Sequence, residues 1–188
     1  LLDDNFATIV NAVEEGRTIY SNIRKSIEFL LSCNTGEIIA IFTAILFGFG
    51  SPLTPIQILW MNLVTDSLPA LALGVEPPEK GVMARGPPNP KEGVFSEGIG
   101  RNIIIQGTII GFLALAAFWL ALYWDRSIDE AHTMAFLTMS FSQLIHAFNV
   151  RSFKQSLFSI GLGTNRALVG AFFASATLQL VVIFVPFL

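Results

Sequence analysis

The chain has 188 residues, of which 53% are hydrophobic and only 13% are charged. Soluble domains carry about 25% charged residues, so this shortfall and a mean hydropathy of +0.63 indicate a membrane protein. A net charge of −3 gives no indication of a nucleic-acid-binding surface, and the single cysteine, Cys33, excludes a disulfide framework within one chain.

The first 26 residues predict an amphipathic helix that runs into the first membrane span. Apolar side chains recur there at near-helical spacing among acidic and basic ones. They are Phe6, Ile9, Val10, Val13, Ile19 and Ile23. We expect this stretch to form a cytoplasmic stalk segment, with an interruption at Gly16.

Five later segments are long and apolar enough to cross a bilayer, since a membrane helix needs about 20 mostly apolar residues. They are approximately 27–48, 56–75, 102–123, 131–149 and 166–187. The predicted fold is therefore all-α: a polytopic transmembrane helical bundle of five spans behind an N-terminal stalk helix. The predicted domains are the stalk, 1–26, and a transmembrane ion-binding and support domain, 27–188.

The distribution of lysine and arginine predicts the orientation of the bundle. Ten of the eleven basic residues lie before the first span, between the second and third spans, or between the fourth and fifth. Cytoplasmic loops carry an excess of basic residues, so these three regions should be cytoplasmic. No signal peptide is visible, and we expect a fragment of a longer multi-pass protein in the plasma membrane of a prokaryote or in an organelle membrane.

Two carboxylates lie inside predicted spans without a basic partner. Glu37 is in the first span and Asp66 in the second, and no lysine or arginine stands at a similar depth. A charged side chain at the centre of a bilayer costs roughly 2.5–3.5 kcal/mol on insertion scales. Two unpaired carboxylates in one bundle therefore require a cation, or they must be protonated.

Oxygen-bearing side chains stand near both acids. Asn34 precedes Glu37 by three residues and Asn62 precedes Asp66 by four, so each pair shares a helix face. Thr65 adds a hydroxyl group beside Asp66. The spacing predicts a site of oxygen ligands between the first two spans.

Pro69 adds backbone oxygens to this set, because a proline cannot donate to the carbonyl of Thr65 four residues before it. Interrupted helices at mid-membrane line cation-binding cavities in transporters. Together these groups supply about six to eight oxygens, the hard shell that Ca²⁺ prefers. The sequence has no Cys/His cluster, so we do not expect a site for a soft metal.

The fourth span carries Gln143 and His146 on one face. Gln143 suits a neutral ligand and a hydrogen bond to a neighbouring helix equally well, whereas His146 is more often a satisfied bundle histidine. Single polar residues inside spans usually join helices to one another. We interpret four in that way: Thr35, Thr43, Ser140 and Ser142.

The sequence runs around the two membrane carboxylates resemble the membrane helices of P-type calcium ATPases of the sarcoplasmic-reticulum type. The run 62–74, followed by Glu76-Pro77-Pro78, resembles their sixth membrane helix, and 32–37 resembles their fifth. Residues 3–23 are similar to the segment that leaves the phosphorylation domain, and 133–149 to the eighth helix. The resemblance covers essentially the whole chain and implies the C-terminal membrane region of such a pump.

A pump of this kind implies ATP-driven transport through an aspartyl-phosphate intermediate, with Ca²⁺ exported from the cytoplasm in exchange for protons. The resemblance implies metal ligands at Asn34, Glu37, Asn62, Thr65, Asp66 and Gln143. Gln143 stands where those pumps place a glutamate, which puts a second Ca²⁺ in doubt.

The resemblance also implies partners: the lipid bilayer, and the cytoplasmic domains and first four helices of the same pump. ATP and Mg²⁺ belong to the full-length protein only. The chain has no Asp-Lys-Thr-Gly phosphorylation motif, so we expect no catalytic or cofactor-binding residue in it. Alone it should neither hydrolyse ATP nor transport.

Three other functions stay open. A P-type pump for Na⁺ or H⁺ is one, although the sodium–potassium branch carries an acid at the position of Asn62. A passive cation channel or secondary carrier is another; such carriers often show internal repeats, and we find none in this sequence. A structural membrane domain without an ion is the third, and the unpaired Glu37 and Asp66 argue against it.

Overall fold

The computed structural model describes residues 6–79, 81–84, 93–96, 98–153 and 155–185, and every regular element in these ranges is helical. The long elements are α1 (Phe6–Leu46), α4 (Ile99–Tyr123), α5 (Ile128–Asn149) and α7 (Arg166–Phe184). The shorter ones are α2 (Pro55–Trp60), η1 (Met61–Asp66), α3 (Ser67–Gly74), η2 (Val82–Ala84), α6 (Leu157–Ile160) and η3 (Leu162–Thr164). The all-α prediction is confirmed.

Four helices in the described ranges are long and apolar enough to cross a membrane: Phe6–Leu46, Pro55–Gly74, Ile99–Tyr123 and Arg166–Phe184. They correspond to the first, second, third and fifth predicted spans. The fourth, α5, has 22 residues, or about 33 Å at 1.5 Å per residue, which is long enough for the ~30 Å hydrocarbon core. Helix α5 is not among the four helices that are apolar enough to cross a membrane, because its many polar side chains lower its hydropathy.

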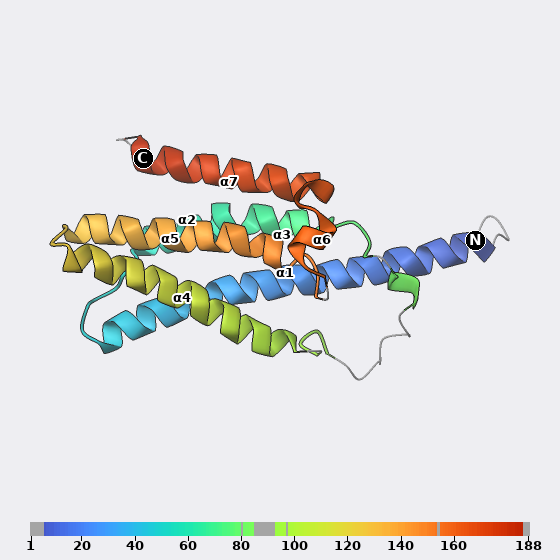
Figure 1. Cartoon of the computed structure of the whole chain (residues 1–188), viewed down its shortest axis with the longest axis horizontal. Helices are drawn as coiled ribbons and strands as arrows, with labels where there is room; N and C mark the ends of the chain where they lie inside the picture. Colours follow the sequence, from blue (N-terminus) through green and yellow to red (C-terminus); the bar gives the residue numbers. More distant parts are fainter. Residues whose placement is uncertain (1–5, 80, 85–92, 97, 154, 186–188) are drawn as a thin grey trace.

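The first helix, α1, continues through Gly16 without a break, so the predicted interruption there is wrong. A glycine inside a helix costs only about 1 kcal/mol relative to alanine, and a contact beside it supports the helix: the Arg17 guanidinium donates to the Val82 carbonyl over 3.1 Å. The N-terminal part of α1 extends beyond the other helices (Figure 1). The division into a stalk and a membrane domain stays a prediction.

Glycines allow α1 and α4 to cross closely. A Cβ atom on Gly107 would lie 2.7 Å from Thr35 Cβ, and one on Gly111 would lie 2.6 Å from the Gly36 carbonyl oxygen. Gly107 and Gly111 form a GxxxG spacing, which lets helix backbones approach in membranes. Because Gly36 precedes Glu37, this crossing sets the position of the first predicted ligand-bearing helix.

The second predicted span is one helical path made of three elements, α2, η1 and α3. It begins at a capping box in which the Thr54 hydroxyl accepts from the Gln57 backbone N–H and the Gln57 side chain accepts from Thr54 N–H, with Pro55 in the first turn. In the middle, η1 is a π-helix of six residues. A π-turn inside an α-helix is rare and is frequent at functional sites.

A buried polar cluster joins the ends of three helices. Glu76, just after α3, accepts from Arg151 Nη2 over 2.7 Å and from Arg151 Nε over 3.0 Å. Asn165, the N-cap of α7, donates to the other Glu76 oxygen over 2.6 Å and to the Ala72 carbonyl over 2.9 Å. From α1, Asn22 donates to the Glu76 backbone carbonyl over 2.7 Å. This cluster fixes α1, α3, α5 and α7 at one end of the bundle.

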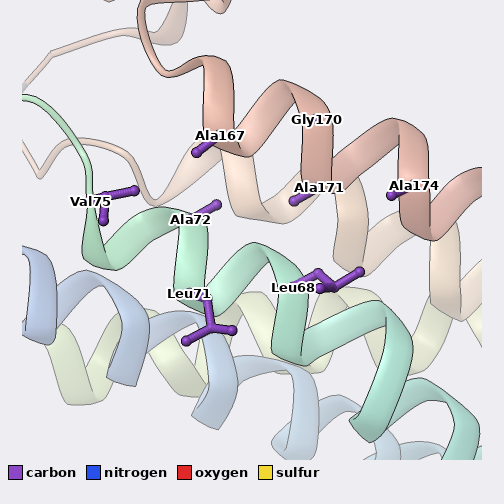
Figure 2. Close-up of a pocket in the computed structure, with 8 residues that line it drawn as sticks. All are labelled: Leu68, Leu71, Ala72, Val75, Ala167, Gly170, Ala171 and Ala174. Carbon is purple, nitrogen blue, oxygen red and sulfur yellow. The ribbon is translucent and has the colours of Figure 1, made fainter.

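An apolar groove of about 370 Å³ lies between α3 and the first half of α7. Figure 2 shows the side chains that line it, larger ones on α3 and small ones on α7. They are Leu68, Leu71, Ala72, Val75, Ala167, Gly170, Ala171 and Ala174. The two helices are therefore incompletely packed along this stretch.

Candidate ion-binding site

The structure brings Glu37, Asn62 and Gln143 into direct contact, from α1, η1 and α5. Asn62 Nδ2 donates to Glu37 Oε2 over 3.2 Å, and Gln143 Nε2 donates to Glu37 Oε1 over 3.3 Å. Glu37 is 4% exposed and Gln143 is fully buried. One carboxylate therefore joins three helices through two amide groups.

Asp66, the last residue of η1, lies close enough to Glu37 for the two carboxyl groups to interact electrostatically. It is 0% exposed, and neither of its oxygens accepts a hydrogen bond from a nitrogen or oxygen donor in the part of the chain that the structure describes. No lysine or arginine of the described residues forms an ion pair with either acid. A buried carboxylate without donors is costly unless a proton or cation compensates it.

Two further buried oxygens lack partners within the described residues: the hydroxyl of Thr65, the residue before Asp66, and Oε1 of Gln143, whose Nε2 donates to Glu37. With the two Asp66 oxygens they form a set of four unsatisfied acceptors contributed by η1 and α5. Buried polar atoms are nearly always hydrogen-bonded, so these four acceptors are available to a ligand. Because all are oxygens, the ligand expected there is a hard cation.

Two backbone carbonyls of the π-helix η1 accept hydrogen bonds from serine hydroxyl groups. The Asn62 carbonyl accepts from the Ser67 hydroxyl over 2.8 Å, five residues on, and the Val64 carbonyl accepts from the Ser175 hydroxyl of α7 over 2.9 Å. Pro69, buried in the next turn, has no N–H to donate. Serine hydroxyl groups thus contact two backbone carbonyls of this π-helix.

Asn34 is not drawn into the contacts that join the other residues. Its Nδ2 donates to the Leu30 carbonyl of its own helix over 2.8 Å, and the residue is only half-buried. Asn34 lies three residues before Glu37 on α1 and shares its face, and the Leu30 bond engages only the amide nitrogen, whereas a cation would take the amide oxygen. It stays a prediction.

Cys33 lies beside the two carboxylates of the candidate site. It is fully buried, and its thiol interacts with the carboxylates of Asp66 and Glu37. The sequence could not place it there, because a cysteine in an apolar run is typical of any helix core.

The α5 face that carries Gln143 bears two more buried groups without partners within the described ranges: Ser140 Oγ and His146 Nε2. The His146 ring stacks on Phe29, with the centroids 6.0 Å apart. His146 is therefore packed, but it is not the hydrogen-bonded bundle histidine that the sequence favours.

The described residues contain no group of three His, Cys, Asp or Glu side chains suited to a metal ion. Any cation at this site must therefore take amide, hydroxyl and carbonyl oxygens in addition to the two carboxylates. That mixture suits Ca²⁺, which accepts six to eight oxygens in a flexible geometry, better than Mg²⁺, which requires a strict octahedron.

Comparison with known proteins places the chain in a family. The family model described as "Cation transporting ATPase, C-terminus" matches residues 50–188. The chain is 50% identical to calcium-transporting ATPase 1 of Bacillus cereus and 48% identical to the calcium-transporting ATPase of Bacillus subtilis, and each comparison covers 99% of the chain. It is 37% identical over 99% of its length to human calcium-transporting ATPase type 2C member 1.

The chain spans only 23%, 21% and 20% of these three relatives. The comparisons extend the match to α1, which precedes residue 50, and they confirm the resemblance of the whole chain to calcium-transporting ATPases. The chain belongs to the family of cation-transporting ATPases and matches the C-terminal region of that family.

Proposed function

We propose that the chain is the ion-binding membrane part of an ATP-driven P-type pump that exports Ca²⁺ from the cytoplasm in exchange for protons. The observation that carries the proposal is the Asp66 carboxylate, which is buried without a nitrogen or oxygen donor among the described residues and interacts electrostatically with Glu37. A structural membrane bundle has no use for such an arrangement, because it costs free energy that an apolar packing would avoid.

The proposed ligands are Asn34, Glu37, Asn62, Thr65, Asp66 and Gln143, of which the two carboxylates match the charge of one divalent ion. The Gln143 amide has its nitrogen on Glu37 and its oxygen unpartnered, so it can contact the carboxylate and an ion at the same time. The names of the relatives support Ca²⁺ as the cargo.

Proton exchange follows from charge balance. When the ion leaves, two carboxylates remain in a region without a basic partner among the described residues. Protons are the counter-charge that needs no further binding site, and they would travel opposite to Ca²⁺. The proposed direction of Ca²⁺ transport, out of the cytoplasm, rests on the resemblance to calcium pumps and on the predicted cytoplasmic position of the stalk. The proposed membrane is the plasma membrane of a prokaryote or an organelle membrane.

The proposal assigns ATP hydrolysis to parts of the full-length pump outside this chain. ATP and Mg²⁺ would act there, and the first four helices of the pump would complete the membrane bundle. The stalk portion of α1 is the expected link. The loop after α3 lies against it through the Lys25–Glu79 ion pair, with 3.0 Å between Nζ and Oε1, and through the Asn22 contact with Glu76.

Ion-dependent phosphorylation of the full-length protein by ATP tests the proposal. Purified protein would be supplied with Ca²⁺, Mn²⁺ or Na⁺ in turn against a chelator background. We expect phosphoenzyme at the lowest ion concentration with Ca²⁺. Phosphoenzyme that requires Na⁺, or that forms equally well without any of these ions, would contradict the choice of cargo.

A further inference from the structure

The last helix, α7, contacts the ion-binding region with polar groups although it carries none of the proposed ligands. It is among the most apolar of the helices that the structure describes. Its buried residues are Leu168, Ser175 and Gln179, and the two polar ones are both fully buried. Ser175 and Gln179 are four residues apart and therefore share one helix face.

Both polar side chains bind the helical segment that contains η1. The Ser175 hydroxyl donates to the Val64 carbonyl over 2.9 Å, and Gln179 Oε1 accepts from the Trp60 indole N–H over 3.0 Å. Val64 lies inside η1, and Trp60 is the residue before it. The two bonds thus hold η1 at its first residues and at its middle.

These contacts lie on a different side of η1 from the site. Asn62 reaches Glu37 on α1, whereas Trp60 and Val64 reach α7. α7 therefore supports the ligand-bearing π-helix from behind, without contact to an ion at the front.

The rest of the interface between α7 and this segment gives little alternative support. The apolar groove lies between α3 and the first half of α7 (Figure 2), so these two helices pack incompletely there. Beyond the groove, Asn165 fixes the start of α7 to the Ala72 carbonyl. Between that cap and the far end of the helix, the bonds made by Ser175 and Gln179 are the side-chain hydrogen bonds that the described part of α7 makes with this segment.

Stability alone does not account for this choice of residues. Gln179 Nε2 is buried and has no partner among the described residues, and such a donor costs free energy that a leucine of similar size would avoid. We propose that Ser175 and Gln179 are positioning residues, which hold η1 in its π-helical form so that Asn62, Thr65 and Asp66 face the ion. The inference rests on the proposed function.

The test uses the full-length pump and measures the Ca²⁺ concentration that gives half-maximal phosphorylation by ATP. For Ser175→Ala and for Gln179→Leu we expect this concentration to rise about fivefold, the effect of one lost hydrogen bond. The maximal phosphoenzyme level should not change, because neither residue contacts the ion. Ser175→Thr keeps the hydroxyl and should restore the wild-type value.

Thr177→Val is the matched control, since Thr177 is exposed on the same helix. Thermal unfolding in detergent with a Ca²⁺ chelator shows whether the fold is disturbed. Two results would overturn the inference alone: a half-maximal concentration in Ser175→Ala and Gln179→Leu equal to that of Thr177→Val, or a loss confined to the maximal level and the melting temperature. Phosphorylation of the wild-type pump that does not depend on Ca²⁺ would overturn the proposed function as well.

Discussion

At the scale of single residues, the two membrane carboxylates differ in their surroundings. Glu37 accepts from two amides, Asn62 and Gln143, which compensate part of its burial. Asp66 is more deeply buried and has no nitrogen or oxygen donor within the described part of the chain. If the proposed site is correct, we expect Asp66 to depend more strongly on a bound cation than Glu37 does.

Asp66→Asn should weaken Ca²⁺ activation of the full-length pump at least about a hundredfold, because one charge a few ångströms from the ion contributes roughly 4 kcal/mol at an effective dielectric of ~20. Asp125→Asn is the control. Asp125 is exposed in the turn between α4 and α5 and has a φ of 56°, a conformation that asparagine tolerates. Equal activation curves for the two variants would show that Asp66 is not a ligand.

Gln143 determines the expected number of ions per cycle. Two Ca²⁺ ions bring four positive charges, and the proposed ligands in this chain include only two carboxylates, Glu37 and Asp66. We expect one Ca²⁺ per ATP for the wild type and a higher ratio for Gln143→Glu, because the added carboxylate supplies the missing charge. The measurement is transport against ATP hydrolysis in sealed vesicles. Two Ca²⁺ per ATP in the wild type would show that a neutral amide is sufficient.

The sequence identifies the acids of the site but not their contacts. Glu37 and Asp66 are recognisable because unpaired carboxylates in apolar spans are expensive wherever they lie. The Gln143–Glu37 bond joins residues 106 positions apart, and helix periodicity says nothing about which face of α5 meets α1. The proximity of Cys33 to both acids is hidden for the same reason.

At the scale of elements, the glycine crossing of α1 and α4 fixes the helix that carries Glu37. Gly111 meets the Gly36 carbonyl, a backbone group that cannot move aside as a side chain can. Any larger residue at position 111 must push the two helices apart.

Gly111→Ala should therefore destabilise the protein by about 1–3 kcal/mol, the usual cost of overpacking. Unfolding in detergent measures this effect. Gly100→Ala is the matched control in the same helix, because a Cβ there meets nothing within 4 Å and alanine favours the helix. A stability of Gly111→Ala equal to or above that of Gly100→Ala would contradict the close crossing.

The helices themselves are largely predictable from the sequence. Each predicted span coincides with a helix to within a few residues, because long apolar runs leave the backbone no alternative in a bilayer. The sequence does not predict the π-helix. Pro69 indicates a weakened helix, but the bonds from the Ser67 and Ser175 hydroxyls to carbonyls of this segment depend on the three-dimensional structure. The interruption expected at Gly16 is wrong because the loop around Val82 supports α1 there.

At the scale of the whole molecule, the Glu76–Arg151 pair holds one end of the bundle together. Both side chains are almost completely buried, and Asn165 and Asn22 add bonds to Glu76 from α7 and α1. In the sequence, Arg151 is one of the basic residues between the fourth and fifth predicted spans, where it only helps to predict the orientation of the bundle. Its pairing with an acid 75 positions away could not be deduced from a loop composition.

Arg151→Met should cost about 3–5 kcal/mol of stability, since it leaves Glu76 buried without a counter-charge. Adding Glu76→Gln should recover part of that loss. Arg126→Met serves as the control, because its pair with Glu130 is exposed and 4.0 Å long, and it should change stability by less than about 1 kcal/mol. If Arg151→Met unfolds at the same denaturant concentration as Arg126→Met, the cluster does not join the helices.

Equilibrium binding of radioactive Ca²⁺ to the purified full-length protein tests whether Glu37 and Asp66 hold Ca²⁺ inside the membrane. The measurement needs neither ATP nor turnover, so it separates the site from the rest of the pump. We predict saturable binding by the wild type and by Asp125→Asn, and no saturable binding by the double variant Glu37→Gln, Asp66→Asn. If the double variant binds Ca²⁺ with wild-type affinity and capacity, Glu37 and Asp66 are not ligands of the ion.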